Sequence, residues 1–202
     1  DRYKLAFYTI RMNISAWLDH AIKQLREIGV DSARLDAELI LANTLRKNRT
    51  YLHAHPEDDI DPRRVDIANA RLRLRLERVP LAYILGYRDF YGRRFTVSPQ
   101  VLVPRPESEA IIELLKELGV SGKLLDIGTG SGCLGITAKL EIPELNVILS
   151  DISQPALRVA RQNAEKFQAD VALIKSNLLR AIPGKFDIII ANLPYVDRSW
   201  QR

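Results

Sequence analysis

The sequence predicts an α/β protein in which a small bundle of helices and a short β-hairpin precede a parallel sheet. Two observations support this prediction. Apolar residues recur at helical spacing over residues 13–80, whereas over 104–202 short apolar runs alternate with helical patterns. Strands that alternate with helices form parallel sheets with helices on both faces. We therefore expect the sheet of the second half to be covered on both sides.

The first two helices of the bundle have recognisable starts. The first begins at Asn13 or Ser15, either of which can cap it, and Gly29 is expected to end it. The second begins at Asp31 or Ser32, which are also favoured capping residues. Apolar residues follow at helical spacing in both segments, so each helix is expected to bury one face.

The third helix is expected to start at Asp61, with Pro62 in its first helical position. Arg and Leu alternate over 71–76, and such strict alternation of polar and apolar residues is typical of a strand. The apolar residues on both sides keep the helical spacing, so we predict a helix there. A hairpin that links the two domains is predicted at 81–103, where glycines occur among aromatic and β-branched residues.

Four short apolar runs in the second half are predicted to be strands, and helical patterns separate the first three. These runs are 123–127, 146–150, 171–175 and 186–191. No repeat is visible at the period of a solenoid. One α/β sheet with a helical domain before it is therefore the expected architecture.

The composition is that of an ordinary folded protein, with 47% hydrophobic and 27% charged residues. Cys133 is the single cysteine, so an intrachain disulfide is excluded.

No run is long and apolar enough to cross a bilayer, so we expect a cytoplasmic protein. Residues 1–12 are expected to be a leader that is disordered or added. The net charge of +5 fits either a solvated basic face or attraction to an RNA-rich or acidic partner.

A glycine-rich loop follows the first predicted strand and leads into a helix. It reads Asp126, Ile127, Gly128, Thr129, Gly130, Ser131 and Gly132. Glycines let the backbone pass close to a ligand, and the amides at a helix start can donate to it. Asp151 ends the second predicted strand, where an acid can hold a ribose diol. Together these features predict a nucleoside cofactor at the carboxyl edge of the sheet.

The glycine loop also satisfies the dinucleotide pattern G-x-G-x-x-G, so the loop alone leaves NAD open. Asp126 favours S-adenosylmethionine, because a carboxylate repels a pyrophosphate and attracts a cationic methionine part. The run Asn192, Leu193, Pro194 and Tyr195 favours it too. The Asn oxygen and a nearby backbone carbonyl can accept both hydrogens of a planar NH₂ group, and Tyr195 can pack on that group. Alternatively, Asn192 is only a turn residue.

With these residues and several further stretches, the chain resembles the HemK/PrmC family of release-factor glutamine methyltransferases. The similarity runs from about Asn13 onward and includes 78–86 and 90–92. Its most specific piece is Val101, Leu102, Val103, Pro104, Arg105, Pro106, Glu107, Ser108 and Glu109. The glycine loop and the segment that starts at Asp151 complete the match.

The resemblance implies a Rossmann-like S-adenosylmethionine-dependent methyltransferase sheet, after a helical domain that recognises the substrate. The implied reaction transfers a methyl group from S-adenosyl-L-methionine to the side-chain amide nitrogen of the glutamine in the Gly-Gly-Gln motif of peptide chain release factors. The implied partner is thus a release factor, and direct nucleic-acid binding stays open without being favoured. Relatives continue for several strands after the Asn192 motif, so the chain is expected to lack a C-terminal part.

The motif matches also give the expected site residues. The catalytic residues are Asn192, Pro194 and Tyr195. The cofactor-binding residues are Asp126, Gly128, Thr129, Gly130, Ser131, Gly132, Asp151, Ile152, Asn177, Leu178 and Asn192. The substrate-binding residues are Asn192, Leu193, Pro194, Tyr195, Arg105 and Glu107. Arg105 and Glu107 have a second interpretation, as structural residues at the start of the next helix, and no metal site is expected.

Two departures from the family keep other functions open. Leu193 stands where the family usually has proline, and the resulting motif is similar to that of ribosomal RNA adenine dimethyltransferases. Asn177 stands where the family usually has an acid, although its oxygen can still accept from the adenine amino group. Methylation of an adenine amino group in RNA or DNA, and an inactive fragment that only binds, are the alternatives; a dinucleotide oxidoreductase is a more distant one. Cys133 is interpreted as a packing residue and His53 and His55 as part of a polar loop.

Overall fold

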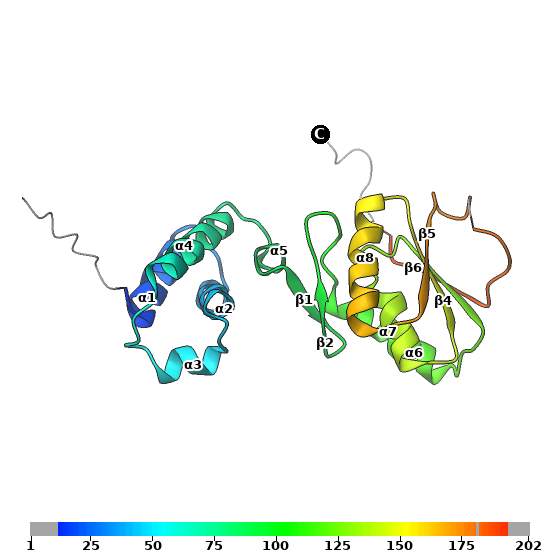
Figure 1. The fold of residues 1–202 in the computed structure, drawn as a ribbon, viewed down its shortest axis with the longest axis horizontal. Coiled ribbons are helices and arrows are strands. Elements are labelled where there is room, and N and C mark those ends of the chain that lie inside the picture. Colours follow the sequence, from blue (N-terminus) through cyan, green and yellow to red (C-terminus); the bar gives the residue numbers. More distant parts are fainter. Residues whose placement is uncertain (1–11, 181, 194–202) are drawn as a thin grey trace, which may run out of the picture. The chain divides into compact units, whose positions relative to one another are not determined.

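The computed structural model describes residues 12–180 and 182–193. The chain divides into two compact units between Leu85 and Gly86 (Figure 1). The first consists of helices and is called the helical unit; the second contains a parallel sheet and is called the sheet unit. Residues 1–11 of the expected leader lie outside the described residues, whereas Met12 packs against the core of the helical unit.

The helices of the helical unit begin where the sequence offers capping side chains. They are α1 (Ile14–Glu27), α2 (Ala33–Leu45), α3 (Arg49–Ala54), α4 (Pro62–Leu76) and α5 (Leu81–Leu85). Asn13 accepts a hydrogen bond from the Ala16 amide at 2.8 Å, and Asp61 accepts one from the Arg63 amide at 2.9 Å. The predicted starts of α1 and α4 are therefore confirmed. Helix α3 was not predicted, because its 6 residues are too few to show a helical period.

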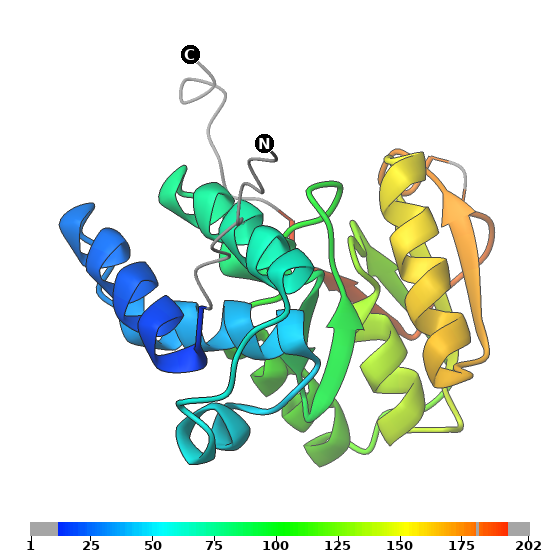
Figure 2. The ribbon, with the colours of Figure 1, turned by 60° about the vertical axis from the view of Figure 1, so that its left-hand side comes forward.

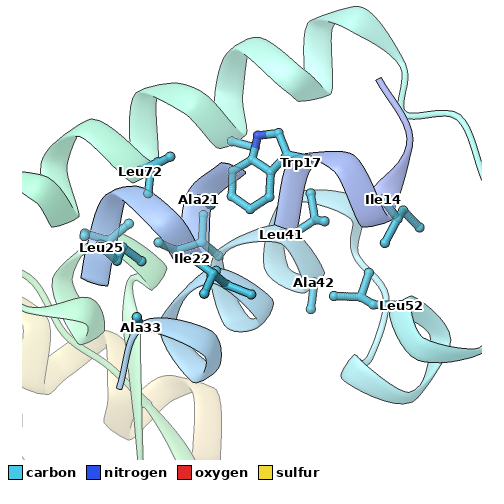
Figure 3. Packing of buried hydrophobic residues seen from close by; sticks show 14 of the residues in the cluster. Ile14, Trp17, Ala21, Ile22, Leu25, Ala33, Leu41, Ala42, Leu52 and Leu72 are labelled. Atoms are coloured by element: carbon cyan, nitrogen blue, oxygen red, sulfur yellow. The ribbon is translucent and has the colours of Figure 1, made fainter. Parts of the chain in front are cut away.

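The core of the helical unit forms around Trp17. Its side chain is 0% exposed and lies among apolar side chains of α1, α2 and α4 (Figure 3). The indole N–H donates to Asn69 Oδ1 on α4 at 2.8 Å. A buried indole needs such a partner, because an unpaired N–H away from water costs free energy. Trp17 therefore joins α1 to α4 through both its apolar ring and its polar edge.

The alternating segment 71–76 lies inside α4, so the prediction of a helix there is confirmed. Its arginines reach α2. Arg71 donates to Asn43 Oδ1 at 2.7 Å, and Arg75 donates to Asp36 Oδ2 at 2.6 Å. Asp36 is buried, so its pairing with Arg75 offsets the cost of removing a charge from water. Part of the basic excess therefore stabilises the helical unit and is not a freely solvated face.

The hairpin is shorter than the predicted segment 81–103. Residues 81–85 form α5, because Ile84 is buried in the core of the helical unit. The hairpin itself consists of the antiparallel strands β1 (Tyr87–Phe90) and β2 (Arg93–Thr96). Phe90 and Phe95 meet edge to face, with ring centroids 6.1 Å apart, in the core of the sheet unit. The hairpin is thus part of the sheet unit.

The remaining elements of the sheet unit match the predicted alternation of strands and helices. They are η1 (Pro106–Ser108), α6 (Glu109–Glu117), β3 (Lys123–Ile127), α7 (Cys133–Glu141), β4 (Asn146–Asp151), α8 (Gln154–Phe167), β5 (Val171–Lys175) and β6 (Ile188–Ala191). The described residues form a sheet of 4 parallel strands in the order β5-β4-β3-β6. Figure 2 shows α8 alongside β5. The predicted α/β architecture is confirmed.

The expectation that helices cover both faces of the sheet is wrong for the described residues. Helices α6, α7 and α8 pack on one face, against Leu124, Val147 and Leu149 (Figure 1). Strand crossovers are right-handed, so the steps from β3 to β4 and from β4 to β5 place α7 and α8 on the same face. The chain then reverses direction across the sheet, and the connection 176–187 contains no helix among its described residues. On the other face, Ile189 is 52% exposed.

The order of the strands reverses between β3 and β6, since β4 and β5 extend from β3 in one direction and β6 lies on its other side. In open α/β sheets, such a reversal leaves a crevice at the carboxyl ends of the strands between which it occurs. The glycine loop follows β3 and Asn192 follows β6. The fold therefore brings these two predicted motifs to the same crevice.

Candidate functional site

A cavity of about 280 Å³ opens at the carboxyl edge of the sheet. A smaller one of about 50 Å³ shares four of its lining residues, Leu102, Gly128, Gly130 and Asn192. The larger cavity brings together the predicted site residues Gly128, Gly130, Asp151, Ile152, Asn177, Leu178, Asn192 and Leu193. The smaller one brings together Asp126, Gly128, Thr129, Gly130, Ser131, Arg105 and Asn192. The two cavities form one elongated site with Asn192 where they join.

The glycine loop has a backbone that other residues would strain. Gly128 has a φ of 68°, and a Cβ there would lie 2.5 Å from Leu193 Cδ2. Gly132 has a φ of 80° and caps α7, and a Cβ there would lie 2.7 Å from Ile136 Cδ1. A side chain at either position would meet both an unfavourable backbone and a steric clash. Gly132 lines neither cavity, so it shapes the loop without facing the space inside.

Asp126 is buried beneath the glycine loop. Its Oδ2 accepts a hydrogen bond from Thr129 Oγ1 at 2.7 Å and one from the Gly135 amide at 3.1 Å. Burial raises the pKa of Asp126 to about 6, the two hydrogen bonds act in the opposite direction, and the nearby Asp151 carboxylate raises the pKa further. No Lys or Arg of the described residues pairs with Asp126. A negative charge at this position is therefore available to attract a cation.

Asp151, at the end of β4, holds the loop from the opposite side. Its Oδ2 accepts from the Gly130 amide at 3.0 Å, and its Oδ1 accepts from the Ser153 amide at 2.8 Å. Each carboxylate oxygen has a second lone pair, so the side chain can still accept hydrogen bonds from a ligand in the larger cavity. The geometry suits the predicted contact with a diol.

Asn192 stands directly after β6, and its amide is oriented by a residue far away in sequence. Its Nδ2 donates to Ser108 Oγ at 3.0 Å. No described residue donates to its Oδ1, which is left to accept from a ligand. Ser108 belongs to the stretch of closest family resemblance but was not predicted as a site residue. The sequence could have indicated Ser108, because it directly follows Glu107 in that stretch.

The wall opposite the glycine loop was also missed. Gln100, Val101 and Leu102 line the larger cavity, and Leu102, Val103 and Pro104 line the smaller one. Apart from Gln100, these residues are apolar and carry no chemical signature, so the sequence identified only Arg105 and Glu107 of the stretch. Of those, Arg105 lines the smaller cavity, and Glu107 lines neither.

The remaining predicted site residues have different positions. Ile152 and Leu178 are exposed apolar residues of the larger cavity, and Leu178 has a φ of 52°. Asn177 lies beside Leu178 and is also exposed. Pro194 and Tyr195 lie outside the described residues, so their predicted roles are not placed by this geometry.

Other chemistry considered from the sequence finds little support. Cys133 is buried, and burial raises the pKa of its thiol to about 12, which favours an unreactive packing residue. His53 lies on α3 and not in the expected polar loop, with its Nε2 3.4 Å from Glu38 Oε1, and the His55 ring packs against Tyr51, with centroids 4.4 Å apart. Within 12–180 and 182–193, His, Cys, Asp and Glu form no group of three that could hold a metal ion. No helix in the same ranges is long and apolar enough to cross a membrane.

Two family models match the chain. The model described as the PrmC N-terminal domain matches residues 16–86, and the one described as the methyltransferase small domain matches residues 106–201. The first match lies in the helical unit apart from its last residue, and the second lies in the sheet unit.

Known proteins are similar to this chain over most of its length. A release factor glutamine methyltransferase of Koribacter versatilis is 44% identical over 193 residues, which cover 92% of this chain and 68% of that protein. One of Staphylococcus aureus is 36% identical over 192 residues, covering 93% of this chain and 68% of that protein. Among solved structures, a tRNA uracil methyltransferase of Pyrococcus abyssi in complex with S-adenosyl-L-homocysteine is 20% identical, with a TM-score of 0.44, and the match covers 51% of this chain and 26% of that one.

Proposed function

The chain belongs to the family of release factor glutamine methyltransferases, and we propose that it methylates the side-chain amide nitrogen of the glutamine in the Gly-Gly-Gln motif of a peptide chain release factor. The observation that carries the proposal is Asn192, whose amide is oriented by Ser108 at the junction of the two cavities. An oriented Asn oxygen suits a planar NH₂ group as substrate.

The protein is a methyltransferase, and its cofactor is S-adenosyl-L-methionine. The residues fit this group. The larger cavity offers the Asp151 carboxylate to a ribose and the apolar side chains of Ile152 and Leu178 to an adenine ring. The smaller cavity offers the Asp126 carboxylate, which carries no paired cation among the described residues, to the cationic methionine part. When bound, S-adenosylmethionine supplies an electrophilic methyl group.

The proposed role of Asn192 is to hold the nucleophile. Its Oδ1 accepts one hydrogen of the glutamine NH₂, and the backbone carbonyl of Leu193 or Pro194 accepts the other. A glutamine nitrogen is a weak nucleophile, because its lone pair is delocalised into the carbonyl group. Positioning the nitrogen and stabilising the positive charge that develops on it therefore supply most of the acceleration. The nitrogen can release its proton after the transfer, so no general base is required.

Ser108, which lines the smaller cavity, supports this arrangement. Because Ser108 Oγ accepts from Asn192 Nδ2, the amide of Asn192 presents its oxygen and not its nitrogen to the substrate. Tyr195 is proposed to pack on the flat amide group, and Arg105, at the smaller cavity, is proposed to contact the substrate. Glu107 faces neither cavity, which favours a structural role at the start of α6.

The helical unit is proposed to recognise the release factor, as the family match over 16–86 suggests. Two arginines of α4, Arg71 and Arg75, are already bound to α2, so they are not free to bind RNA. The expected bounds were 13–80 for recognition, 81–103 for the link and 104–202 for the methyltransferase, but α5 packs in the core of the helical unit. A recognition part up to Leu85 and a methyltransferase part from Gly86 therefore remain a proposal. So does a cytoplasmic location.

A methyl-transfer assay tests the proposal. The protein is incubated with labelled S-adenosylmethionine and, side by side, a release factor, the same factor with its Gly-Gly-Gln glutamine changed to alanine, and ribosomal RNA. Mass mapping should place the label on that glutamine in the first sample only. Label on the RNA, or on both release factors equally, would contradict the proposed substrate.

A further inference from the structure

Asn163 is a buried polar residue of α8 that the proposed chemistry does not use. Its side chain is 0% exposed and makes three hydrogen bonds. Oδ1 accepts from the Thr96 amide at 2.8 Å, while Nδ2 donates to Thr96 O at 2.9 Å and to Ser131 O at 2.8 Å. Both donors and an acceptor lone pair are thus satisfied, which fixes the orientation of the amide group.

The two residues that Asn163 binds lead into opposite walls of the larger cavity. Ser131 belongs to the glycine loop. Thr96 ends β2, and the chain continues from it to the wall residues Val101 and Leu102. The two walls approach each other at Gly130, where a Cβ would lie 3.9 Å from Val101 Cβ. The separation of Thr96 from Ser131 therefore influences the width of the cavity.

The hairpin has no backbone ladder to the parallel sheet, since among the described residues β1 and β2 form a sheet of their own. Side chains must provide the polar connections. Lys166 Nζ donates to Arg94 O at 2.5 Å, and Arg93 pairs with Glu141 at 2.6 Å, but neither contact includes the glycine loop. Asn163 contacts both the hairpin and the loop.

We propose that Asn163 is a positioning residue, which fixes the hairpin to the glycine loop and so holds the two cavity walls at the separation that S-adenosylmethionine requires. The proposal rests on the proposed function only in taking this cavity as the cofactor site. Helix α8, which carries Asn163, is itself packed against the glycine loop. Ala160, one turn before Asn163, lies so close to Gly132 that a Cβ on Gly132 would lie 3.2 Å from Ala160 Cβ. Asn163 therefore acts through the loop and touches no reacting atom.

The substitution Asn163→Asp tests the proposal with little change of volume. An Asp keeps the acceptor for the Thr96 amide but turns an acceptor toward Thr96 O and Ser131 O, so the loop loses its attachment. We expect the Kd for S-adenosylmethionine, measured by calorimetry, to rise at least tenfold. Lys166→Ala, which removes a hairpin contact that does not include the loop, should change the Kd less than twofold. An unchanged Kd in a folded Asn163→Asp protein would overturn the proposal.

A loss of general stability must be separated from a loss of positioning. Leu145→Ala creates a cavity in the core near the amino end of β4, away from the cofactor cavity. With a comparable fall in Tm, it should leave the Kd within twofold of wild type. If Leu145→Ala weakens binding as much as Asn163→Asp does, the role of Asn163 is only structural.

Hydrogen exchange on the wild-type protein tests the same connection without a variant. Saturating S-adenosylmethionine should slow exchange of the Thr96 amide, although Thr96 lines neither cavity. Equal exchange with and without cofactor would overturn the proposal. Each of these measurements reports on cofactor binding, so each stays valid if the release factor proves not to be the substrate.

Discussion

Buried carboxylates have different kinds of partner in the two units. In the helical unit, Asp36 pairs with Arg75 at 2.6 Å and Glu38 pairs with Arg49 at 2.5 Å, so each buried negative charge has an arginine partner. In the sheet unit, Asp126 is held by a hydroxyl and a backbone amide, and no described cation pairs with it. Pairing neutralises a charge for stability, whereas an unpaired carboxylate in a cavity remains able to act on a ligand.

The largest effect on stability is expected from breaking a pair in the helical unit. Asp36→Ala leaves the guanidinium of Arg75, whose side chain is only 17% exposed, without its counter-charge. Breaking such buried pairs costs about 3 to 5 kcal/mol. Urea unfolding followed by the fluorescence of the buried Trp17 should show a loss of this size, with the Kd for S-adenosylmethionine unchanged.

The control for this change is Arg34→Ala. Arg34 lies 3.7 Å from Glu38 and is 64% exposed, so its loss should cost less than about 1 kcal/mol. If Asp36→Ala costs no more than Arg34→Ala, the pairs in the helical unit do not carry its stability.

A smaller effect, on binding and not on folding, is expected for the sheet unit. Asp151→Ala removes a charged acceptor from the larger cavity and should weaken cofactor binding by about 1 to 3 kcal/mol. Calorimetry with S-adenosylmethionine measures this loss directly. Because Asp151 also accepts from the Gly130 amide, Asp151→Asn, which keeps an acceptor oxygen, should lose less. Equal affinity for wild type and Asp151→Ala would remove Asp151 from the site.

The smallest expected effect is the pH dependence of binding that Asp126 causes. Burial raises the pKa of Asp126 from 3.8 to about 6, so the carboxylate becomes neutral as the pH falls through about 6. The ionised form attracts the sulfonium and ammonium groups of the cofactor. Affinity for S-adenosylmethionine should therefore fall about fourfold between about pH 7.5 and 5.5, the ratio of the ionised fractions.

S-adenosylhomocysteine, which lacks the sulfonium charge, should show a smaller fall, and Asp126→Asn should remove most of the dependence. The stability of the free protein depends on pH in the opposite direction to the cofactor affinity. Between about pH 4 and 6 the folded state holds a proton on Asp126 that the unfolded state has lost, so this group's contribution to stability decreases as the pH rises. A pH profile of binding that Asp126→Asn leaves unchanged would assign the titration to another group.

The sequence predicted the elements whose signals are local. The caps Asn13 and Asp61, the alternation of strands with helices, and the positions of Gly128 and Asn192 at strand ends all follow from residues that lie close together in the chain. The shared crevice followed as well, because parallel strands place their carboxyl ends on one edge.

Features that depend on long-range contacts could not be predicted. The bond from Asn192 to Ser108 spans 84 residues, and the bonds from Asn163 to Thr96 span 67. The uncovered face of the sheet depends on the strand order, which no local pattern encodes. Helix α5 was assigned to the hairpin because only packing in the core of the helical unit shows where Ile84 belongs.

The most direct test of the account is a comparison of rate and affinity for Asn192→Ala. Asn192 is proposed to position the glutamine nitrogen, whereas the glycine loop binds the cofactor. Single-turnover transfer to a release factor should therefore slow by about a hundredfold or more, while the Kd for S-adenosylmethionine stays within about twofold of wild type. A Kd that rises in proportion to the lost rate would contradict the account, because Asn192 would then support the cofactor and not the reacting amide.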